Sequence, residues 1–516
     1  MKEWLALLLI YALLATCSFA LADDTRISGL YTYSIKGNGT VSIVDYDWSK
    51  SSGDIYIPSM LDGYSVTTIG EEAFAYGKKT SKKAALIVIP DSITAIGEKA
   101  FYNSPISTVS IPVSVKLIGK AAFAYCDITQ FIVDQKQPYF ATIDGVLYDK
   151  RNKALLSHPQ CKAVSSKIPE GILSISEYAF SGLSIGNSDT SALCLTDILP
   201  STLERIEPHA FENCTIYYST NNSQSGITYY NSYANNLALL PSNLTSVGDY
   251  AFTGCVFRCN SYSTPETIVI AENLKEVGDY AFSDCKFYDG FEYDLIVSNV
   301  EITRIGKFAF ASSVVFSMDN DRMKVRINLP DIIDKIDENA FFETHPVCIG
   351  KEAQIKDLGA SAFRNTIVYT EMKKEKYQDE VPISLSISGT MKTIPPLAFA
   401  YRFDDNLNSV ERISIQEGIT VISESAFSGR KSLQIVDLPM SLEEIGDNAF
   451  SECQNILEIV IPDSIMRIGK NAFERQYITL IVKENSYAEL WASENGYNYR
   501  YDDIKDDLDW LNSDIH

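Results

Sequence analysis

The chain has 516 residues, of which 46% are apolar, and a formal net charge of −23 at pH 7. A single compact core stops growing near ~250–300 residues, so this length calls for several domains or for a stack of repeats that each touch only their neighbours. The acidic balance and the lack of basic patches argue against nucleic acid or an anionic membrane as a partner.

Residues 1–22 have the pattern of a signal peptide. Lys2 precedes an apolar run, Trp4–Leu14, and the small-residue stretch Ala20–Ala22 offers a cleavage site. Two alternatives stay open, a membrane anchor and a lipoprotein cleavage box at Leu14–Cys17. Because no later apolar segment reaches the ~18 residues that span a bilayer, we expect an exported mature chain, secreted or at the cell surface.

Residues 23–65 are expected to form an N-terminal cap. Apolar and β-branched runs predict strands at Leu30–Ile35, Thr40–Val44 and Ile55–Ile57, with turn formers between them. The first rung of a solenoid has to be covered, and this stretch directly precedes the first repeat.

A six-residue phrase, I-G-D-N-A-F at Ile445–Phe450, organises the rest of the chain. It recurs fourteen times, each time with Ala before Phe and with Ile, Val or Leu five residues before Phe. The shortest spacings are 22 and 23 residues, within the roughly 20–29 residues of leucine-rich repeats. We therefore predict a solenoid over residues 66–478. The copies end at Phe74, Phe101, Phe123, Phe180, Phe211, Phe252, Phe282, Phe310, Phe341, Phe363, Phe399, Phe427, Phe450 and Phe473.

Each repeat also contains an alternating segment that predicts a strand. In the repeat that ends at Phe450, Val436 should point inward and Ile435 and Asp437 outward, and Pro439 should end the strand because it cannot donate to a ladder. The predicted fold is therefore a β-rich leucine-rich-repeat solenoid with parallel strands on the concave face and short turns or helical pieces on the convex face.

The residue after the motif aliphatic is Gly in nine of the fourteen copies. Five copies have another residue there, among them Pro395, whose φ is fixed near −65°. Positive φ is therefore not required, and the sequence favours close approach between rungs as the reason for Gly.

Nine cysteines follow Cys17, an odd number that prevents complete pairing. Adjacent rungs stack ~4.8 Å apart with parallel side chains, whereas a disulfide needs Cβ atoms ~3.5–4.5 Å apart on converging bonds. We expect a ladder of buried free thiols at the position three residues after the motif Phe. The cysteines at this position are Cys126, Cys214, Cys255, Cys285 and Cys453.

Three breaks in the spacing predict insertions, near residues 131–165, 214–238 and 364–382. The first contains a hairpin that begins at Asp144, the second reads as a tyrosine-rich hairpin, and the third is a charged excursion. Residues 479–516 should form a C-terminal cap with one helix, on which Tyr487, Leu490 and Trp491 share a face, and then an acidic tail.

The phrase I-P-D-S-I-x-x-I-G-x-x-A-F at Ile461–Phe473 resembles the BspA-type leucine-rich-repeat family. The likeness extends to Gly63–Phe74, to D-G-V-L-Y from Asp144 and to S-Y-A-E-L-W-A from Ser486. It implies an exported surface protein of bacteria or parasitic protists that acts in adhesion or host-protein binding.

Sequence motifs for chemistry are scarce. The chain has only four histidines, which limits both metal and acid-base sites. We expect all four at the surface, and Cys255 with Cys259 is too little for zinc. We therefore expect no catalytic residue, no metal and no cofactor. The alternative is a polysaccharide-acting enzyme on a solenoid scaffold, which would need carboxylates gathered in a groove.

The expected partner is an extracellular protein or glycan, bound by a monomer. Two surfaces compete for it: the tyrosine-rich insertion, whose composition suits adaptable recognition, and the outward positions of the strands. The predicted partner-binding residues are Tyr217, Tyr218, Tyr229, Tyr230, Arg326, Arg412 and Asp437.

Overall fold

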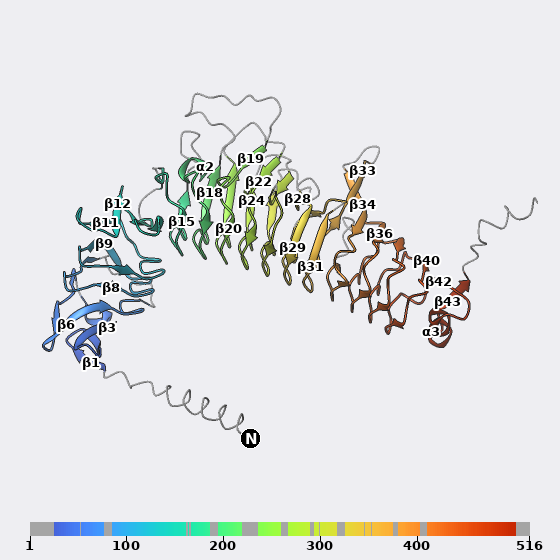
Figure 1. Cartoon of the computed structure of the whole chain (residues 1–516), viewed down its shortest axis with the longest axis horizontal. Coiled ribbons are helices and arrows are strands. Elements are labelled where there is room, and N and C mark those ends of the chain that lie inside the picture. Colours follow the sequence, from blue (N-terminus) through green and yellow to red (C-terminus); the bar gives the residue numbers. More distant parts are fainter. Residues whose placement is uncertain are drawn as a thin grey trace, which may run out of the picture. The chain divides into compact units, whose positions relative to one another are not determined.

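The computed structural model describes residues 25–501, apart from 52, 77–84, 161–163, 165–166, 186–194, 219–235, 260–266, 289–293, 299, 317–325, 345, 352, 375–379 and 403–409. The predicted signal peptide and the acidic tail therefore lie outside the described residues. The chain divides into two compact units, residues 1–163 with 176–181, and residues 164–175 with 182–516. Each unit is rich in short strands (Figure 1).

In the first unit, the predicted cap and the first repeats share one sheet. Strands β1, β2 and β3 are antiparallel neighbours, and β3 then pairs in parallel with β6, the strand that leads into the first motif. The sheet contains β1 (Thr25–Ser28), β2 (Tyr31–Ile35), β3 (Thr40–Tyr46), β5 (Met60–Leu61), β6 (Tyr64–Ile69), β8 (Ala95–Ile96) and β10 (Leu117–Ile118). The 3-10 helix η1 (Trp48–Lys50) follows β3.

A second sheet of the first unit is parallel throughout and contains β4 (Ile55–Tyr56), β7 (Ala85–Val88), β9 (Ile106–Ile111) and β11 (Gln130–Val133). The first insertion follows as an antiparallel meander of β12 (Phe140–Ile143), β13 (Val146–Asp149) and β14 (Ala154–Ser157). The hairpin predicted from Asp144 onward is therefore confirmed, with one strand more than expected.

The second unit is a stack of rungs whose strands form parallel series. In each rung a short strand directly precedes the position of the motif glycine, and over residues 174–358 these strands form one parallel series. The sequence predicted turns or helical pieces for this part of the rung. The series contains β15 (Ser174–Ile175), β17 (Arg205–Ile206), β20 (Ser246–Val247), β23 (Glu276–Val277), β26 (Arg304–Ile305), β29 (Ile332–Ile336) and β31 (Gln354–Leu358). Helix α2 (Leu195–Ile198) lies between β16 and β17 in the chain.

Two further parallel series belong to the same rungs. The first contains β16 (Ser184–Ile185), β18 (Thr215–Tyr218), β21 (Val256–Cys259), β24 (Lys286–Tyr288) and β27 (Val314–Phe316). The second contains β19 (Asn236–Ala238), β22 (Thr267–Val269), β25 (Asp294–Ile296), β28 (Arg326–Asn328), β30 (Val347–Cys348) and β32 (Val368–Tyr369).

The last rungs contain three sheets. One comprises β33 (Glu371–Lys374), β34 (Glu380–Ile387), β36 (Arg412–Ile415) and β38 (Ile435–Asp437), and another β35 (Thr393–Ile394), β37 (Val421–Ile422), β39 (Glu444–Ile445) and β41 (Arg467–Ile468). The third comprises β40 (Glu458–Val460), β42 (Thr479–Val482) and β43 (Asn498–Tyr501), with helix α3 (Tyr487–Asn495) before β43.

The motif phenylalanines form the core of each stack. All fourteen are at most 4% exposed, and in the second unit successive rings from Phe211 to Phe473 lie 5.0–5.7 Å apart and nearly parallel. In eleven of the fourteen copies the backbone N–H of the Phe also donates to the carbonyl of the Ala in the next rung, as from Phe450 to Ala472 at 2.7 Å. This seam fixes the register of the rungs.

The prediction about the motif glycine is confirmed. None of the nine glycines has positive φ, and a Cβ on any of them would lie 2.7 Å or less from a backbone atom of the preceding rung. Positive φ occurs instead two residues before the Phe, at all fourteen copies, with φ of 49–58° in side chains as different as Tyr250, Leu397 and Asn448.

The thiol ladder is also confirmed, because Cys126, Cys214, Cys255, Cys285 and Cys453 are buried and form no disulfide. In eight copies the side chain at this position donates to the carbonyl of the Phe in the preceding rung. Cys255 Sγ lies 2.9 Å from the oxygen of Phe211, and Arg430 Nε lies 2.8 Å from that of Phe399. A buried donor therefore suits this position, although Leu183 shows that an apolar residue also fits.

Three expectations about the other elements need correction. The first arm of the tyrosine-rich hairpin is the rung strand β18, because Thr215 and Ile216 pair in parallel with strands on both sides; its second arm lies outside the described residues. The charged excursion contains a hairpin, because β33 pairs antiparallel with β34. Helix α3 buries Trp491 with two alanines, whereas Leu490 is 58% exposed.

The surface assignment is wrong for His158. This side chain is buried, stacks 5.2 Å from the ring of Phe180, and places Nδ1 3.0 Å from the oxygen of Pro159. His209 is half-buried, and His345 and His516 lie outside the described residues.

Candidate partner-binding face

Outward side chains of the last parallel strands form an extended face, which we call the terminal strand face. Inward positions such as Ile413, Val436, Ile459 and Leu480 are buried, so the residues between them point outward. The register of β34 with β36, β36 with β38, and β40 with β42 and β43 then places the outward residues in rows. They are Ser384, Ser386, Arg412, Ser414, Ile435, Asp437, Glu458, Val460, Thr479, Ile481, Asn498 and Arg500.

Two of the predicted partner-binding residues meet on this face. Arg412 on β36 holds Asp437 on β38 with both ends of its guanidinium, Nε at 2.7 Å from Oδ2 and a terminal nitrogen at 3.0 Å from Oδ1. Ser414 donates to the same carboxylate at 2.7 Å. A bidentate pair with a third donor has one preferred geometry, so both side chains are held in place although about half of each is exposed.

A second bidentate pair lies on the last strands. Arg500 on β43 contacts both carboxylate oxygens of Glu458 on β40, at 3.2 and 3.0 Å, and so crosses over β42. The hydrogen bond from Arg500 lowers the pKa of Glu458. Arg500 was missed by the sequence analysis because β43 comes after helix α3 and carries no repeat motif.

Apolar side chains lie between the two pairs. Ile435 is 46% exposed and Val460 52% exposed, at positions that a parallel sheet on a solvated face usually gives to polar residues. Ile481 has the matching position on β42, where it is only 8% exposed. The terminal strand face thus combines exposed apolar surface with two fixed ion pairs.

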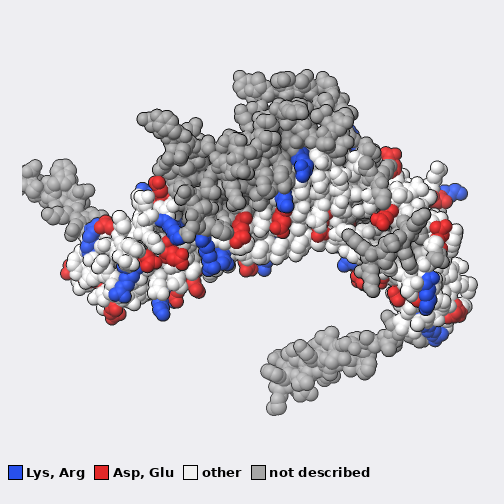
Figure 2. Space-filling view, turned by 180° about the vertical axis from the view of Figure 1, so that it is seen from behind, with Lys and Arg blue, Asp and Glu red and all other residues white. Residues whose placement is uncertain are grey.

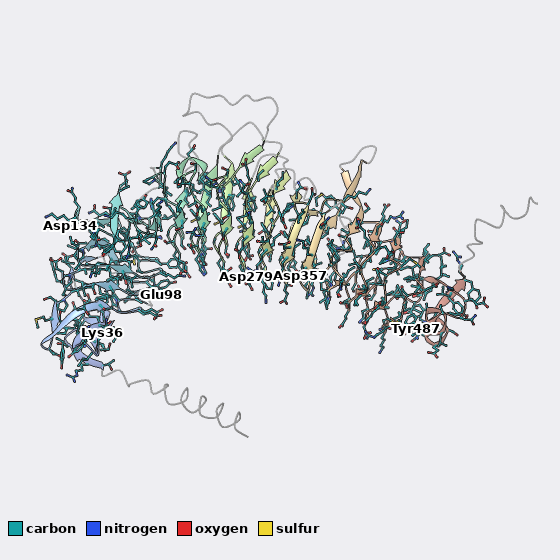
Figure 3. All side chains as sticks on the ribbon, viewed as in Figure 1. Lys36, Glu98, Asp134, Asp279, Asp357 and Tyr487 are labelled. Atoms are coloured by element: carbon teal, nitrogen blue, oxygen red, sulfur yellow. The ribbon has the colours of Figure 1, made fainter. Side chains whose placement is uncertain are left out.

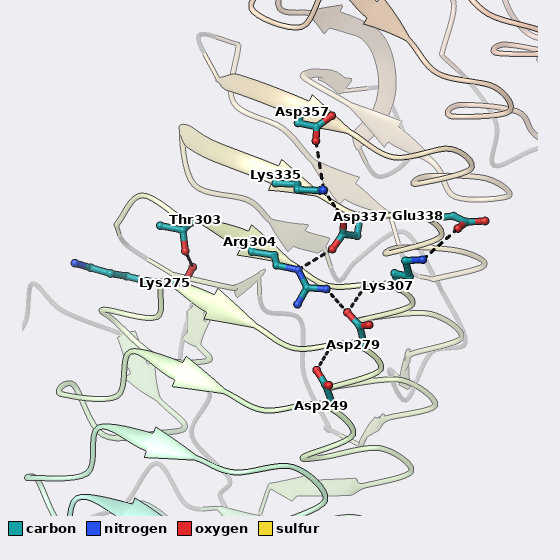
Figure 4. A network of polar contacts seen from close by, with 10 residues as sticks. All are labelled: Asp249, Lys275, Asp279, Thr303, Arg304, Lys307, Lys335, Asp337, Glu338 and Asp357. Carbon is teal, nitrogen blue, oxygen red and sulfur yellow. Dashed lines mark hydrogen bonds and ion pairs between the residues drawn. The ribbon is translucent and has the colours of Figure 1, made fainter. Parts of the chain in front are cut away.

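A different face of the second unit carries a network of ion pairs (Figure 4). Arg304 on β26 contacts both Asp279 of the preceding rung and Asp337 of the next, the latter at 2.7 Å. Lys335 lies between Asp337 at 3.2 Å and Asp357 at 3.5 Å, and the hydrogen bond that it donates to Asp337 raises its pKa. Acidic and basic side chains of neighbouring rungs therefore pair with one another.

Backbone contacts show that this network also holds the rungs together. Asp249 Oδ1 accepts the N–H of Asp279 at 2.7 Å, and Asp279 Oδ1 accepts the N–H of Lys307 at 3.0 Å. Figure 3 shows Asp279 and Asp357 on the same side of the strands. Asp249, Asp279 and Asp337 each contact a neighbouring rung, which indicates a structural role.

A row of aromatic side chains occupies the positive-φ position of four rungs. His209, Tyr250, Tyr280 and Phe308 stack at 4.7–4.9 Å with interplanar angles of 2–10°. Ring faces inside such a stack contact each other, so the row presents ring edges. Because sugars pack against ring faces, the middle of this row is poorly suited to bind a glycan.

The remaining predicted residues do not join the terminal strand face. Tyr217 is half-buried on β18, and Tyr218 follows it on the same strand. Arg326 begins β28, which belongs to the sheet that ends at β32. Tyr229 and Tyr230 lie outside the described residues.

The described ranges contain neither a metal-ligand group nor a membrane-spanning helix. No group of three or more His, Cys, Asp or Glu residues in this part of the chain could hold a metal ion. None of its helices has the length and hydropathy to cross a membrane. On the surface visible in Figure 2, basic and acidic side chains are interspersed.

Several solved structures are similar. A leucine rich cell surface protein from Faecalibacterium prausnitzii A2-165 is 21% identical, with 88% of this chain and 96% of that chain covered and a TM-score of 0.37. A leucine-rich repeat protein from Bacteroides ovatus is 16% identical, with 92% and 99% covered and a TM-score of 0.36. The pneumococcal vaccine antigen PcpA is 14% identical, with 93% and 99% covered and a TM-score of 0.25. No curated protein matches the chain.

The sequence profile of the BspA type leucine rich repeat region matches the chain six times. The matches cover residues 52–142, 158–255, 190–314, 227–368, 320–403 and 392–490. They include every copy of the motif phenylalanine, and they agree with the parallel rungs of the structure. The chain belongs to the BspA-type leucine-rich-repeat family.

Proposed function

We propose that this protein is an exported, non-catalytic surface protein that binds an extracellular protein or glycan through the terminal strand face, in adhesion or host interaction. The observation that carries the proposal is the exposed pair Ile435 and Val460 between two bidentate ion pairs. Family membership supports a binding role, because the repeat builds a scaffold and no catalytic motif.

The ion pairs favour binding for a physical reason. Side chains that are immobilised before a partner arrives lose less conformational entropy in the complex, roughly 0.5–1.5 kcal/mol for each long side chain. Arg412 and Arg500 are held in this way. An apolar centre with a polar rim that excludes water is also the usual arrangement of an energetic hot spot.

The enzyme alternative has less support. A glycosidase needs two carboxyl groups about 5–10 Å apart on either side of a substrate, with one of them protonated near neutral pH. Asp437 and Glu458 on the terminal strand face each accept two hydrogen bonds from an arginine. The hydrogen bond from Arg500 lowers the pKa of Glu458, which is the opposite of what a general acid needs.

Arrays of extracellular matrix proteins and of glycans, probed with the secreted protein, would identify the ligand class. Val460→Asp and Arg412→Ala then test the terminal strand face, and we expect each to weaken binding at least about tenfold, equivalent to 1.4 kcal/mol. Met466→Asp and Arg467→Ala are matched controls, because Met466 is 65% exposed and Arg467 pairs with Glu444 on a different sheet.

Deletion of residues 219–226 tests the rival surface, the tyrosine-rich insertion. If the deletion abolishes binding while Val460→Asp and Arg412→Ala bind normally, the partner uses the insertion and the terminal strand face is the wrong site. Turnover of a polysaccharide by the unmodified protein would favour the enzyme alternative.

A further inference from the structure

A groove lies on the first unit at the carboxyl ends of β7, β9 and β11. Its volume is about 530 Å³, within the range of roughly 300–1,000 Å³ of ligand sites. It is formed by residues of the first unit alone and is thus a second site, independent of the terminal strand face. Its lining residues are Ile89, Asp91, Ser110, Ile111, Pro112, Val113, Ser114, Ile132 and Asp134.

The walls of the groove are partly apolar and accessible. Val113 is 40% exposed and Ile132 is 47% exposed, and both line the groove. Ile132 aligns with Ser110 on β9, which aligns with Val88 on β7, so the groove crosses three neighbouring strands. An apolar side chain of a ligand would remove both residues from water.

One wall is held in place by a buried amide. Gln137 is 1% exposed, and its Nε2 donates to the carbonyls of Pro112 at 3.0 Å and Val115 at 2.8 Å. Its Oε1 accepts the N–H of Tyr139 at 2.7 Å. The loop that carries Val113 is therefore fixed from behind, and the groove has its shape before a ligand binds.

Two carboxylates stand at opposite ends of the groove. Asp91 follows β7 and Asp134 follows β11, so they are two strand spacings apart, about 10 Å. Both are exposed. Among the described residues neither has an ion-pair partner, in contrast to the paired acids of Figure 4, although Asp134 Oδ1 accepts the N–H of Lys136 at 2.7 Å.

We propose that this groove binds an extended basic segment of a partner protein. Two Lys or Arg side chains of the segment contact Asp91 and Asp134, and the apolar residue between them packs on Val113 and Ile132. In an extended chain, residues i, i+2 and i+4 point to the same side. Basic residues at i and i+4 are then about 13 Å apart with the apolar residue at i+2 between them, and their flexible stems adjust to the carboxylate spacing of about 10 Å. The net charge of −23 favours a basic partner in addition.

A peptide is favoured over a glycan because both carboxylates are acceptors only, and because the groove contributes branched aliphatic walls and no aromatic ring for a sugar to pack against. Cations satisfy both carboxylates without a second donor. A neutral glycan would need further groups to recognise its own acceptors.

The probe is a fluorescein-labelled heptapeptide, Gly-Lys-Ser-Leu-Ser-Lys-Gly, measured by fluorescence anisotropy at low ionic strength. We expect binding that weakens as salt rises, because both carboxylates are exposed. The double variant Asp91→Asn with Asp134→Asn should bind roughly tenfold more weakly or worse, and Val113→Ser should weaken binding by a smaller factor. Asp45→Asn is the matched control, because Asp45 is an exposed carboxylate on β3.

Asparagine keeps the shape of aspartate, and unchanged thermal melting of the variants would show that they fold. Equal binding of Gly-Glu-Ser-Leu-Ser-Glu-Gly, or full affinity in the double variant, would overturn the proposal. Glycan binding that the double variant abolishes, without binding of the lysine peptide, would assign the groove to a sugar and overturn it as well. Because the measurement does not involve Val460 or Arg412, failure here leaves the proposed function intact.

Discussion

Replacing Gly446 with Ala tests whether the motif glycine serves close packing between rungs. A Cβ at this position would lie 2.6 Å from the backbone N of Glu424 and 2.7 Å from the carbonyl carbon of Ser423, about 0.8 Å inside an ordinary contact. Both atoms belong to the backbone of the preceding rung, so no side chain can turn away. The substitution must push two rungs apart.

The expected cost can be bounded from rungs that already carry a side chain here. The N–H of Gly446 donates to Ile422 at 2.7 Å, whereas that of Ser423 donates to Ile394 at 2.9 Å. The same difference separates the other glycine rungs, at 2.7–2.8 Å, from Ser176, Glu207 and Asp337, at 2.9 Å. Rungs can thus open slightly, and of the roughly 1–3 kcal/mol typical of overpacking we expect the lower half, about 1–2 kcal/mol.

Urea unfolding followed by circular dichroism would measure the loss, and native-state hydrogen exchange would locate it to the rungs around Gly446. The variant Gly446→Asn distinguishes two explanations for the glycine, close packing between rungs and a need for an unusual backbone conformation. Asn adopts positive φ more readily than Ala, but it is larger, so Asn should be worse than Ala at Gly446. At Gly496, where φ is 67°, the order should reverse.

Two results would refute this reasoning. One is a Gly446→Ala variant as stable as the unmodified protein, and the other is a Gly446→Asn variant more stable than Gly446→Ala. Either would mean that the glycine is present for its backbone conformation or for no structural reason.

Three further predictions follow from the core and the terminal strand face. Phe450→Ala should cost about 3–5 kcal/mol in urea unfolding, because the ring is fully buried, and hydrogen exchange should rise first in the C-terminal rungs. Burial raises the pKa of the Cys255 and Cys285 thiols, so iodoacetamide at pH 8 should modify them only after unfolding, as read by peptide mass spectrometry. The hydrogen bond from Arg500 lowers the pKa of Glu458. The stability that this pair contributes should therefore be fully present above the usual carboxyl pKa and be lost as the pH falls through the lowered pKa. In the Arg500→Gln variant, the pKa of Glu458 measured by NMR should return toward its usual value.

Each of these has a contrary outcome. Unchanged exchange near residue 450 would contradict the core assignment, and rapid labelling of the native thiols would contradict their burial. A Glu458 carboxyl that titrates identically with and without Arg500 would mean that the pair of the terminal strand face is not formed in solution.

Much of the fold could be predicted because the same motif occurs fourteen times, so a residue type that recurs at one position indicates a shared structural role. The buried Ala and Phe, the close approach at Gly and the thiol position are each repeated, so a single sequence shows them. The positive-φ position could not be found, because its occupants include Tyr250, Leu397 and Asn448 and the usual signal, glycine, is absent. At this position the hydrogen bonds between rungs outweigh the preference of a non-glycine residue for negative φ.

The candidate site was only half predictable. Alternation along each strand placed Arg412 and Asp437 outward, but their pairing depends on how two strands 23 residues apart are aligned, which appears only in the register. The sequence did not predict that Val460 is exposed, because an aliphatic residue next to Ile459 is more typical of the core. The groove of the first unit is formed where the ends of three strands and a loop held by a buried amide lie side by side. No residue spacing in the sequence indicates this arrangement.

The seam between motif residues has a consequence for how this protein can change over generations. Phe341 and Phe363 are 22 residues apart, whereas Phe211 and Phe252 are 41 apart, yet both pairs of rungs are joined by the same 2.8 Å bond from Phe N–H to the Ala carbonyl. The segment between two motifs can therefore gain or lose residues without altering the joint. Segments between motifs can therefore be exchanged during evolution, and a foreign peptide grafted between two motifs would be displayed on an intact scaffold.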